Sequence, residues 1–153
     1  MKITVDGFIF AAPIPVGQYS ARGGEGPFPA WCAETTEFLR FGEVIEYDHV
    51  DGLSAWSAPI SLSLDQLMSW AASEGWPANA TESEAIQRDI WAIIAGHQGA
   101  IDVGHPALTM RASLLHSDSR QDLLVSRVVS EPDPAAILLI GCLLLAGFRM
   151  LRT

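Results

Sequence analysis

The order of apolar and polar positions divides the chain into a strand-rich first part, two helices and a last pair of strands. Alternating apolar residues between turns rich in Gly, Pro and Asp predict the strands. We predict strands over residues 2–10, 16–22, 30–38, 43–50, 108–115 and 122–129. Strands followed by helices and then strands predict an α+β domain. We therefore expect a strand-rich domain, built as a β-sandwich or a barrel-like sheet, with two inserted helices.

Two capping-box patterns set the expected starts of these helices. The pattern Ser-x-x-Gln at 63–66 predicts a helix over 63–74, and Gly75 follows as its stop. The pattern Thr-x-x-Glu at 81–84 predicts a second helix over 81–95.

The C-terminal part of the chain has a different character. Residues 135–148 carry no charge, and their apolar side chains cover every face of a helix. A buried helix of the domain is one interpretation, but a short helix at a chain end has few ways to be covered. We therefore expect a single transmembrane helix, although the run is shorter than the roughly 20 residues of a standard spanning helix.

The charges around this run predict its orientation and the domain boundary. Arg149 and Arg152 form a basic end, which favours a cytoplasmic C-terminus and places residues 1–130 outside. We expect an exported domain over 1–130 and a sorting and membrane segment over 131–153. The first apolar run is too short for a signal peptide and Asp6 interrupts it, so we expect the true start and signal peptide to lie upstream of Met1.

Charge and composition limit the function classes. The chain has 9 Lys and Arg against 18 Asp and Glu, with net charge −9, so no nucleic-acid partner is expected. Four scattered histidines lack the spacing of metal ligands. The sequence also lacks phosphate-loop, dinucleotide and nucleophile-elbow motifs, so we expect no cofactor, no metal and no enzyme activity.

A glutamine lies in the apolar face of the second predicted helix. At about 100° per residue, Gln87 falls between Ile94 and Trp91. Burying an amide without partners costs about 1–3 kcal/mol. A hydrogen bond from Gln87 to strand backbone is therefore one interpretation of its position.

The second unusual residue is Cys32, which is the only cysteine in 1–130 because Cys142 lies in the apolar tail. A free cysteine is often a small buried apolar residue. Alternatively, the Cys32 sulfur bonds to the Gln87 side-chain carbonyl and expels ammonia, which gives an internal thioester. Trp31 and Trp91 adjoin the two residues and would shield such a bond from water.

The tail resembles a PEP-CTERM sorting signal. Ser130-Glu131-Pro132 stands where that signal has Pro-Glu-Pro, and the apolar run and the basic end Arg149 and Arg152 follow in the same order. The resemblance implies a Gram-negative bacterium that makes exopolysaccharide. It also implies anchoring in the inner membrane, cleavage by an exosortase near the motif, and release to the cell surface or extracellular matrix.

Two further motifs are similar to those of bacterial thioester domains. Trp-Cys-Ala-Glu at 31–34 and Ile-Gln-Arg-Asp-Ile-Trp at 86–91 match the Cys and Gln-x-Ala-Ile-Trp motifs, with Asp89 in place of the alanine. The likeness covers residues 28–96 and implies that Cys32 and Gln87 are the thioester pair. In reactive members of the family a surface amine on the target attacks the thioester and stays attached through an amide.

These observations leave two main functions open, beside a hydrolase of matrix polymers that no motif supports. The first is a covalent adhesin of the biofilm matrix that reacts through Cys32 and Gln87. The second is a non-covalent structural module that binds extracellular polysaccharide, in which Cys32 is a plain core thiol.

If the tail is a membrane and sorting segment, the domain should fold without it. Cutting the chain after Ser130 removes only the sorting and membrane segment, so residues 1–130 should give a soluble domain with a cooperative thermal transition. Circular dichroism and size-exclusion chromatography check this result. Aggregation or failure to fold would show that the tail is part of the core.

Overall fold

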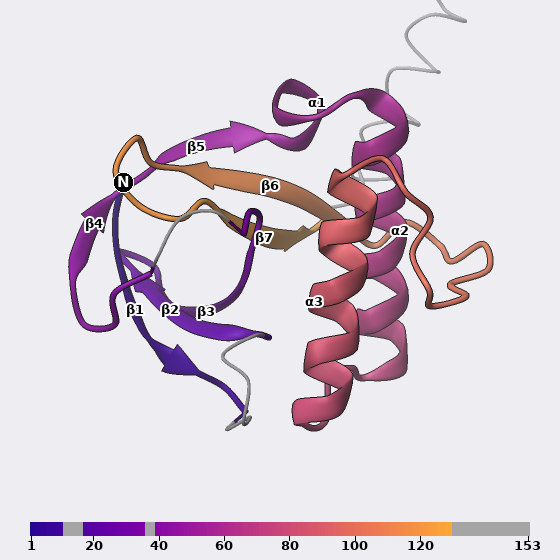
Figure 1. The fold of residues 1–153 in the computed structure, drawn as a ribbon, viewed down its shortest axis with the longest axis horizontal. Coiled ribbons are helices and arrows are strands. Elements are labelled where there is room, and N and C mark those ends of the chain that lie inside the picture. Colours follow the sequence, from indigo (N-terminus) through magenta and orange to yellow (C-terminus); the bar gives the residue numbers. More distant parts are fainter. Residues whose placement is uncertain (11–16, 36–38, 130–153) are drawn as a thin grey trace, which may run out of the picture.

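The computed structural model describes residues 1–10, 17–35 and 39–129. Within these ranges the strands form one antiparallel sheet of order β4-β1-β2-β3-β7-β6-β5, which curves into a nearly closed barrel (Figure 1). The strands are β1 (Lys2–Phe8), β2 (Tyr19–Gly23), β3 (Gly26–Cys32), β4 (Val44–Glu46), β5 (Asp48–Asp51), β6 (Met110–His116) and β7 (Leu123–Val128). The α+β class and the barrel-like sheet are confirmed.

A single residue links the two edges of this sheet. β4 and β5 are the edge strands, and only Tyr47 separates them along the chain. The Tyr47 backbone N–H donates to Met1 O at 2.7 Å, and its hydroxyl donates to Gln121 O at 3.1 Å. The sequence predicted one strand over 43–50, whereas the chain bends at Tyr47 and pairs with β1 on one side and β6 on the other.

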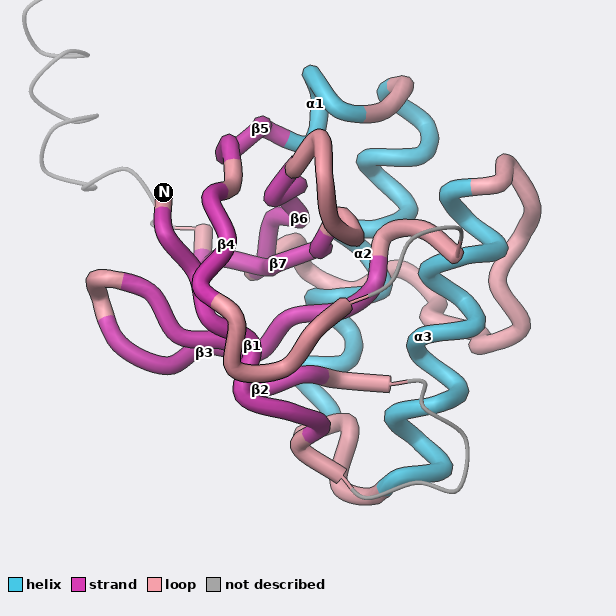
Figure 2. The backbone as a smooth tube through the Cα atoms, turned by 60° about the vertical axis from the view of Figure 1, so that its left-hand side comes forward, coloured by secondary structure: helices cyan, strands magenta, loops and turns pink. Residues whose placement is uncertain are grey.

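The helices cover one side of the barrel. They are α1 (Gly52–Ala55), α2 (Ala58–Glu74) and α3 (Ala80–Ile94), and α2 and α3 lie side by side (Figures 1 and 2). The sequence missed α1, where a turn was expected. Gly75 ends α2 in the left-handed conformation at φ 70°, as predicted.

The predicted start of α2 was wrong. The helix begins at Ala58 after the N-cap Ser57, because Pro59 fits its first turn. Ser63 therefore lies inside the helix, where its hydroxyl donates to Pro59 O at 3.0 Å.

The cap of α3 was also misplaced, by two residues. Asn79 is the N-cap, and its side chain accepts from Glu82 N at 3.0 Å. The Glu82 carboxylate in turn accepts from Ala78 N at 2.7 Å. This differs from a capping box, in which Glu82 would accept from the N–H of the N-cap Asn79 itself. Glu84 forms an ion pair with Arg88.

Two apolar cores share the sheet between them. The first fills the barrel and consists of Ile3, Val5, Tyr19, Ala21, Ala30, Cys32, Ile45, Tyr47, Leu115, Leu123 and Val125. The second lies between the outer face of the sheet and the helices and consists of Trp31, Ala33, Leu64, Leu67, Met68, Ala71, Ile86, Ile90, Ile93, Ala112 and Leu124. Successive residues of β3 face opposite sides, so Cys32 points into the barrel and Trp31 points to the helices.

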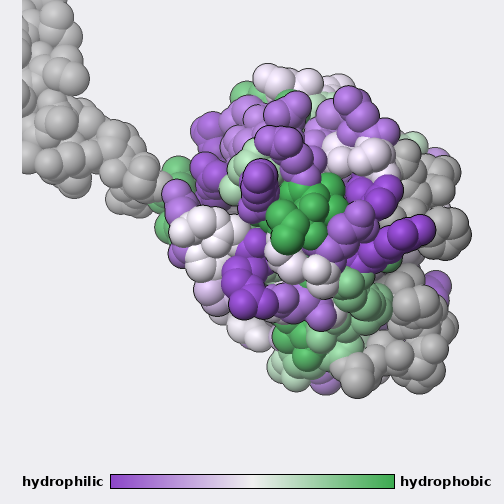
Figure 3. All heavy atoms as spheres, turned by 90° about the vertical axis from the view of Figure 1, so that its left-hand side faces the viewer, coloured by the Kyte–Doolittle hydropathy of each residue, from purple (hydrophilic) through white to green (hydrophobic). Residues whose placement is uncertain are grey.

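The side of the molecule that carries β4 is mostly hydrophilic, with separate small hydrophobic areas (Figure 3). No helix in the part of the chain that the structure describes is long and apolar enough to cross a membrane. The expected membrane helix and the sorting residues Ser130, Glu131, Pro132, Arg149 and Arg152 lie outside the described residues.

Candidate functional site

Gln87 of α3 is fully buried and is bound to the backbone of Cys32. Its Oε1 accepts from the Cys32 N–H at 2.9 Å, and its Nε2 donates to the Cys32 carbonyl at 2.8 Å. One side-chain amide thus forms the two hydrogen bonds that a residue of a neighbouring strand would form. The strand hydrogen bond that the sequence left open is therefore present.

The amide occupies this place because β2 begins only at Tyr19, so no residue of β2 pairs with Cys32. The β2–β3 register pairs Gly23 with Gly26 and Tyr19 with Ala30, so its continuation would bring Gly17 opposite Cys32. Instead, a Cβ on Gly17 would lie only 2.5 Å from Ser83 Oγ, so the first turn of α3 is already there.

Ser83 and Gln87 act together at this strand end. Ser83 Oγ accepts from the Gln18 N–H at 2.8 Å, which holds the chain just before β2. Gln87 lies one helical turn further and reaches β3. The two side chains thus use one face of α3 to satisfy both strands where their ladder stops.

The Cys32 thiol has a different partner. Its Sγ lies 2.8 Å from the Tyr19 hydroxyl, and both residues are only 3% exposed. Burial raises the pKa of Cys32 to about 12, with a further increase from Glu34, and the Tyr19 hydrogen bond opposes this shift. Burial, together with Cys32, also raises the pKa of Tyr19. Both groups are therefore neutral near pH 7, and the resting thiol is a weak nucleophile.

Aromatic side chains surround the site, although not all in the predicted way. Trp31 is buried on the helix side of β3, so it lies across the strand from the sulfur. Trp91 is half-buried and packs on the barrel core that contains Cys32. Its indole N–H is buried and has no hydrogen-bond partner among the described residues.

Two further aromatic residues cover the Tyr19 side of the site. The Phe8 ring lies 4.7 Å from the Tyr19 ring and 5.4 Å from the Phe41 ring, measured between centroids. Phe41 is 49% exposed, so this stack reaches from the thiol partner to the surface. Phe8 also packs on the barrel core that contains Cys32.

Sequence reasoning missed Tyr19, and a signal for it was present. The glycine-rich turn after Gly23 was recognised, and a tight hairpin there fixes the register of β2 and β3. That register puts Tyr19 on the same face as Cys32, as a diagonal cross-strand neighbour.

Glu34 of the Trp-Cys-Ala-Glu motif anchors the end of β3. Its Oε1 accepts from the Asp122 N–H at 2.9 Å, and its carbonyl accepts from Gln121 Nε2 at 2.8 Å. Ala33 N also donates to Asp122 O at 2.9 Å. These bonds tie the residues directly after Cys32 to the start of β7 and fix its backbone.

In an acyl-transfer reaction at this site, the Gln87 carbonyl carbon would be the electrophile, and the Cys32 N–H on its oxygen would stabilise a tetrahedral oxyanion. The nucleophile would be the sulfur of the same Cys32, which is protonated at rest. No hydrogen bond joins the sulfur to the amide in the described structure, since Tyr19 holds the sulfur.

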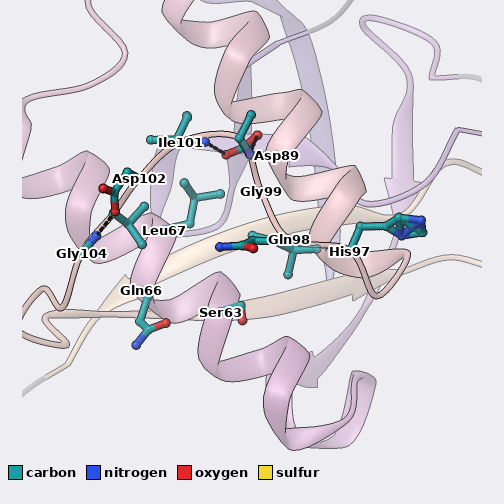
Figure 4. Close-up of a pocket in the computed structure, with 13 residues that line it drawn as sticks. Ser63, Gln66, Leu67, Asp89, His97, Gln98, Gly99, Ile101, Asp102 and Gly104 are labelled. Atoms are coloured by element: carbon teal, nitrogen blue, oxygen red, sulfur yellow. Dashed lines mark hydrogen bonds between the residues drawn. The ribbon is translucent and has the colours of Figure 1, made fainter.

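A separate pocket of about 320 Å³ lies between α2, α3 and the loop after α3 (Figure 4). Its polar lining includes Ser63, Gln66, His97, Gln98 and Asp102, and its apolar lining includes Leu67, Ile93 and Ile101. No lysine or arginine is among the described residues that line it.

Asp89 holds the loop that forms this pocket. It is 4% exposed, and its carboxylate accepts from Ala100 N at 2.8 Å and Ile101 N at 2.7 Å. A Cβ on Gly99 would lie 2.6 Å from Asp89 Oδ2, so only glycine allows this approach. The aspartate that replaces the motif alanine therefore serves the loop rather than Gln87.

Comparison of the chain with protein-family models, curated proteins and solved structures gave no match. The likeness to thioester domains and to PEP-CTERM signals therefore rests on the motif residues given above.

The Gln87 contact predicts a large effect on stability. Gln87→Leu leaves the Cys32 N–H and C=O buried without partners, and we expect a loss of about 2–4 kcal/mol in the free energy of unfolding. Gln66→Leu is the matched control, because Gln66 is partly exposed and has no hydrogen bond among the described residues. Urea unfolding compares the two; equal losses would show that the Gln87 amide does not support β3.

Proposed function

We propose that this chain is an exported bacterial surface or matrix protein that captures amine-bearing targets through a thioester between Cys32 and Gln87. Its tail is an exosortase substrate that holds the protein in the inner membrane before release. The carbonyl of the Gln87 amide becomes the acyl group of the thioester, and its nitrogen leaves as ammonia. Attack by a target amine then gives an amide and returns the free thiol.

One observation carries this proposal: the Gln87 carboxamide is fully buried against Cys32, with its carbonyl oxygen on the Cys32 N–H. A thioester needs its two residues in contact, needs water excluded, and gains from a donor on the carbonyl oxygen. The burial of both residues and the Cys32 N–H on the amide oxygen support the proposal, at the two positions that match the family motifs.

Methylamine treatment of the purified full-length chain tests this function. We expect a methylamide on Gln87, about 14 Da heavier than the ordinary amide by the chemistry of aminolysis, located by peptide mass spectrometry. Cys32→Ala should abolish the adduct, because no thioester then forms. Cys142→Ala, which changes only the tail cysteine, should leave it unchanged. An unmodified Gln87 in the wild-type chain would contradict the proposal.

The pocket between α2 and α3 supports a second function, non-covalent binding of matrix polysaccharide. Its amide, hydroxyl and carboxylate groups suit hydroxyl-bearing ligands, and the side chains of Gln66 and Gln98 have no hydrogen bonds within the described residues. The absence of a cationic residue from the lining favours neutral sugar units over anionic ones. In this function the Cys32–Gln87 contact is only structural.

Titration calorimetry with a neutral oligosaccharide such as cellohexaose tests the second function. We expect the double substitution Gln66→Ala and Gln98→Ala to weaken binding about tenfold, as expected for the loss of two ligand hydrogen bonds. Cys32→Ala should bind like the wild type. Absence of binding, or equal binding by the double variant, would exclude this pocket as a saccharide site.

A further inference from the structure

The Tyr19 hydroxyl has one hydrogen-bond partner among the described residues, and that partner is the Cys32 sulfur. The Oη–Sγ distance is 2.8 Å and the contact is buried. The barrel core contains a second buried tyrosine, Tyr47, but its hydroxyl donates to the Gln121 carbonyl instead. The two tyrosines therefore share burial and differ in what the hydroxyl contacts.

The surroundings of the sulfur disfavour a negative charge. Cys32 lies among apolar side chains of the barrel core, and the charge of Glu34 further opposes ionisation. Opening of a thioester releases the sulfur as a leaving group, and an unpaired thiolate in such a place is costly. The sulfur therefore needs a proton as the carbon–sulfur bond breaks, and the hydroxyl that touches it is that of Tyr19.

We infer that Tyr19 is the general acid of the capture reaction, an inference that rests on the proposed thioester. The target amine attacks the Gln87 carbonyl carbon, the C–S bond breaks, and its electron pair goes to Cys32 Sγ. Tyr19 Oη–H gives its proton to that sulfur, and in the same step its oxygen takes the proton that the amine nitrogen loses on becoming an amide. The two transfers are concerted, because burial raises the pKa of Tyr19 as well as that of Cys32 and disfavours a free phenolate. The sum is amine plus thioester giving amide plus thiol, with no other reactant.

The test compares the full-length wild type with Tyr19→Phe and Tyr47→Phe. Intact mass first measures the closed fraction, and the decay of that closed species in methylamine then gives the capture rate. We expect Tyr19→Phe to react about tenfold to a hundredfold more slowly, within the range of general acid catalysis. Tyr47→Phe removes a buried hydroxyl that bonds to the Gln121 carbonyl and not to the sulfur, so it should keep the wild-type rate.

The outcomes separate this inference from the proposed function. A wild-type chain without any closed species overturns the thioester and this inference with it. If the wild type closes but Tyr19→Phe reacts at the wild-type rate, the role of Tyr19 is overturned and the thioester stands. The same holds if Tyr47→Phe slows the reaction as much as Tyr19→Phe does. A folded Tyr19→Phe chain that never closes, beside a Tyr47→Phe chain that does, supports a role for Tyr19 in proton transfer at the sulfur.

Discussion

Backbone groups of a strand need partners where the neighbouring strand stops, and in this protein helix side chains supply them. Gln87 of α3 does this for Cys32 at the end of β3. α2 does the same for β6 beyond the end of β5. There Asp65 accepts from Ala112 N at 2.7 Å, and Ser69 Oγ accepts from Met110 N at 3.0 Å and from Thr109 N at 3.1 Å. The helices are thus joined to the barrel by side chain to backbone bonds as well as by apolar packing. The candidate site is one of these joints.

This origin explains why the site has two opposed properties. The burial that would protect a thioester from water also keeps the free Cys32 thiol protonated, with its pKa raised to about 12. A closed bond would therefore be stable until a nucleophile enters, and the sulfur would need help to leave. In our proposal Tyr19 gives that help through its contact with the sulfur, and Trp91 and Phe8 pack on the core that contains Cys32.

Much of the fold follows from local sequence, but the hydrogen bonds between helix side chains and strand backbone do not. Period-two alternation located most of the strands, but the strand predicted over 30–38 is β3 at Gly26–Cys32. The wheel position of Gln87 correctly indicated a buried amide. The split at Tyr47 was missed because alternation continues through it, while the two halves pair with opposite edges of the sheet. The start of α2 was missed because a Ser-x-x-Gln spacing also occurs inside helices, and Pro59 was the better signal.

The roles within the site were predictable to different degrees. Cys32 and Gln87 stand out as residue types in unusual places, so the sequence alone paired them. Tyr19 looks like any strand aromatic until the hairpin register is known, because its role depends on a cross-strand neighbour. Trp31 adjoins Cys32 in sequence, yet alternation places it on the other face of β3, so adjacency along a strand was a poor guide to shielding.

The intact mass of the untreated, purified chain measures directly whether the thioester forms. We predict a mass about 17 Da below that of the sequence, which is one ammonia lost on closure. Cys32→Ala should have its full sequence mass. A wild-type mass equal to that of the sequence, with a free Cys32 thiol detected after unfolding, would contradict the thioester and leave the Cys32–Gln87 contact as a structural joint.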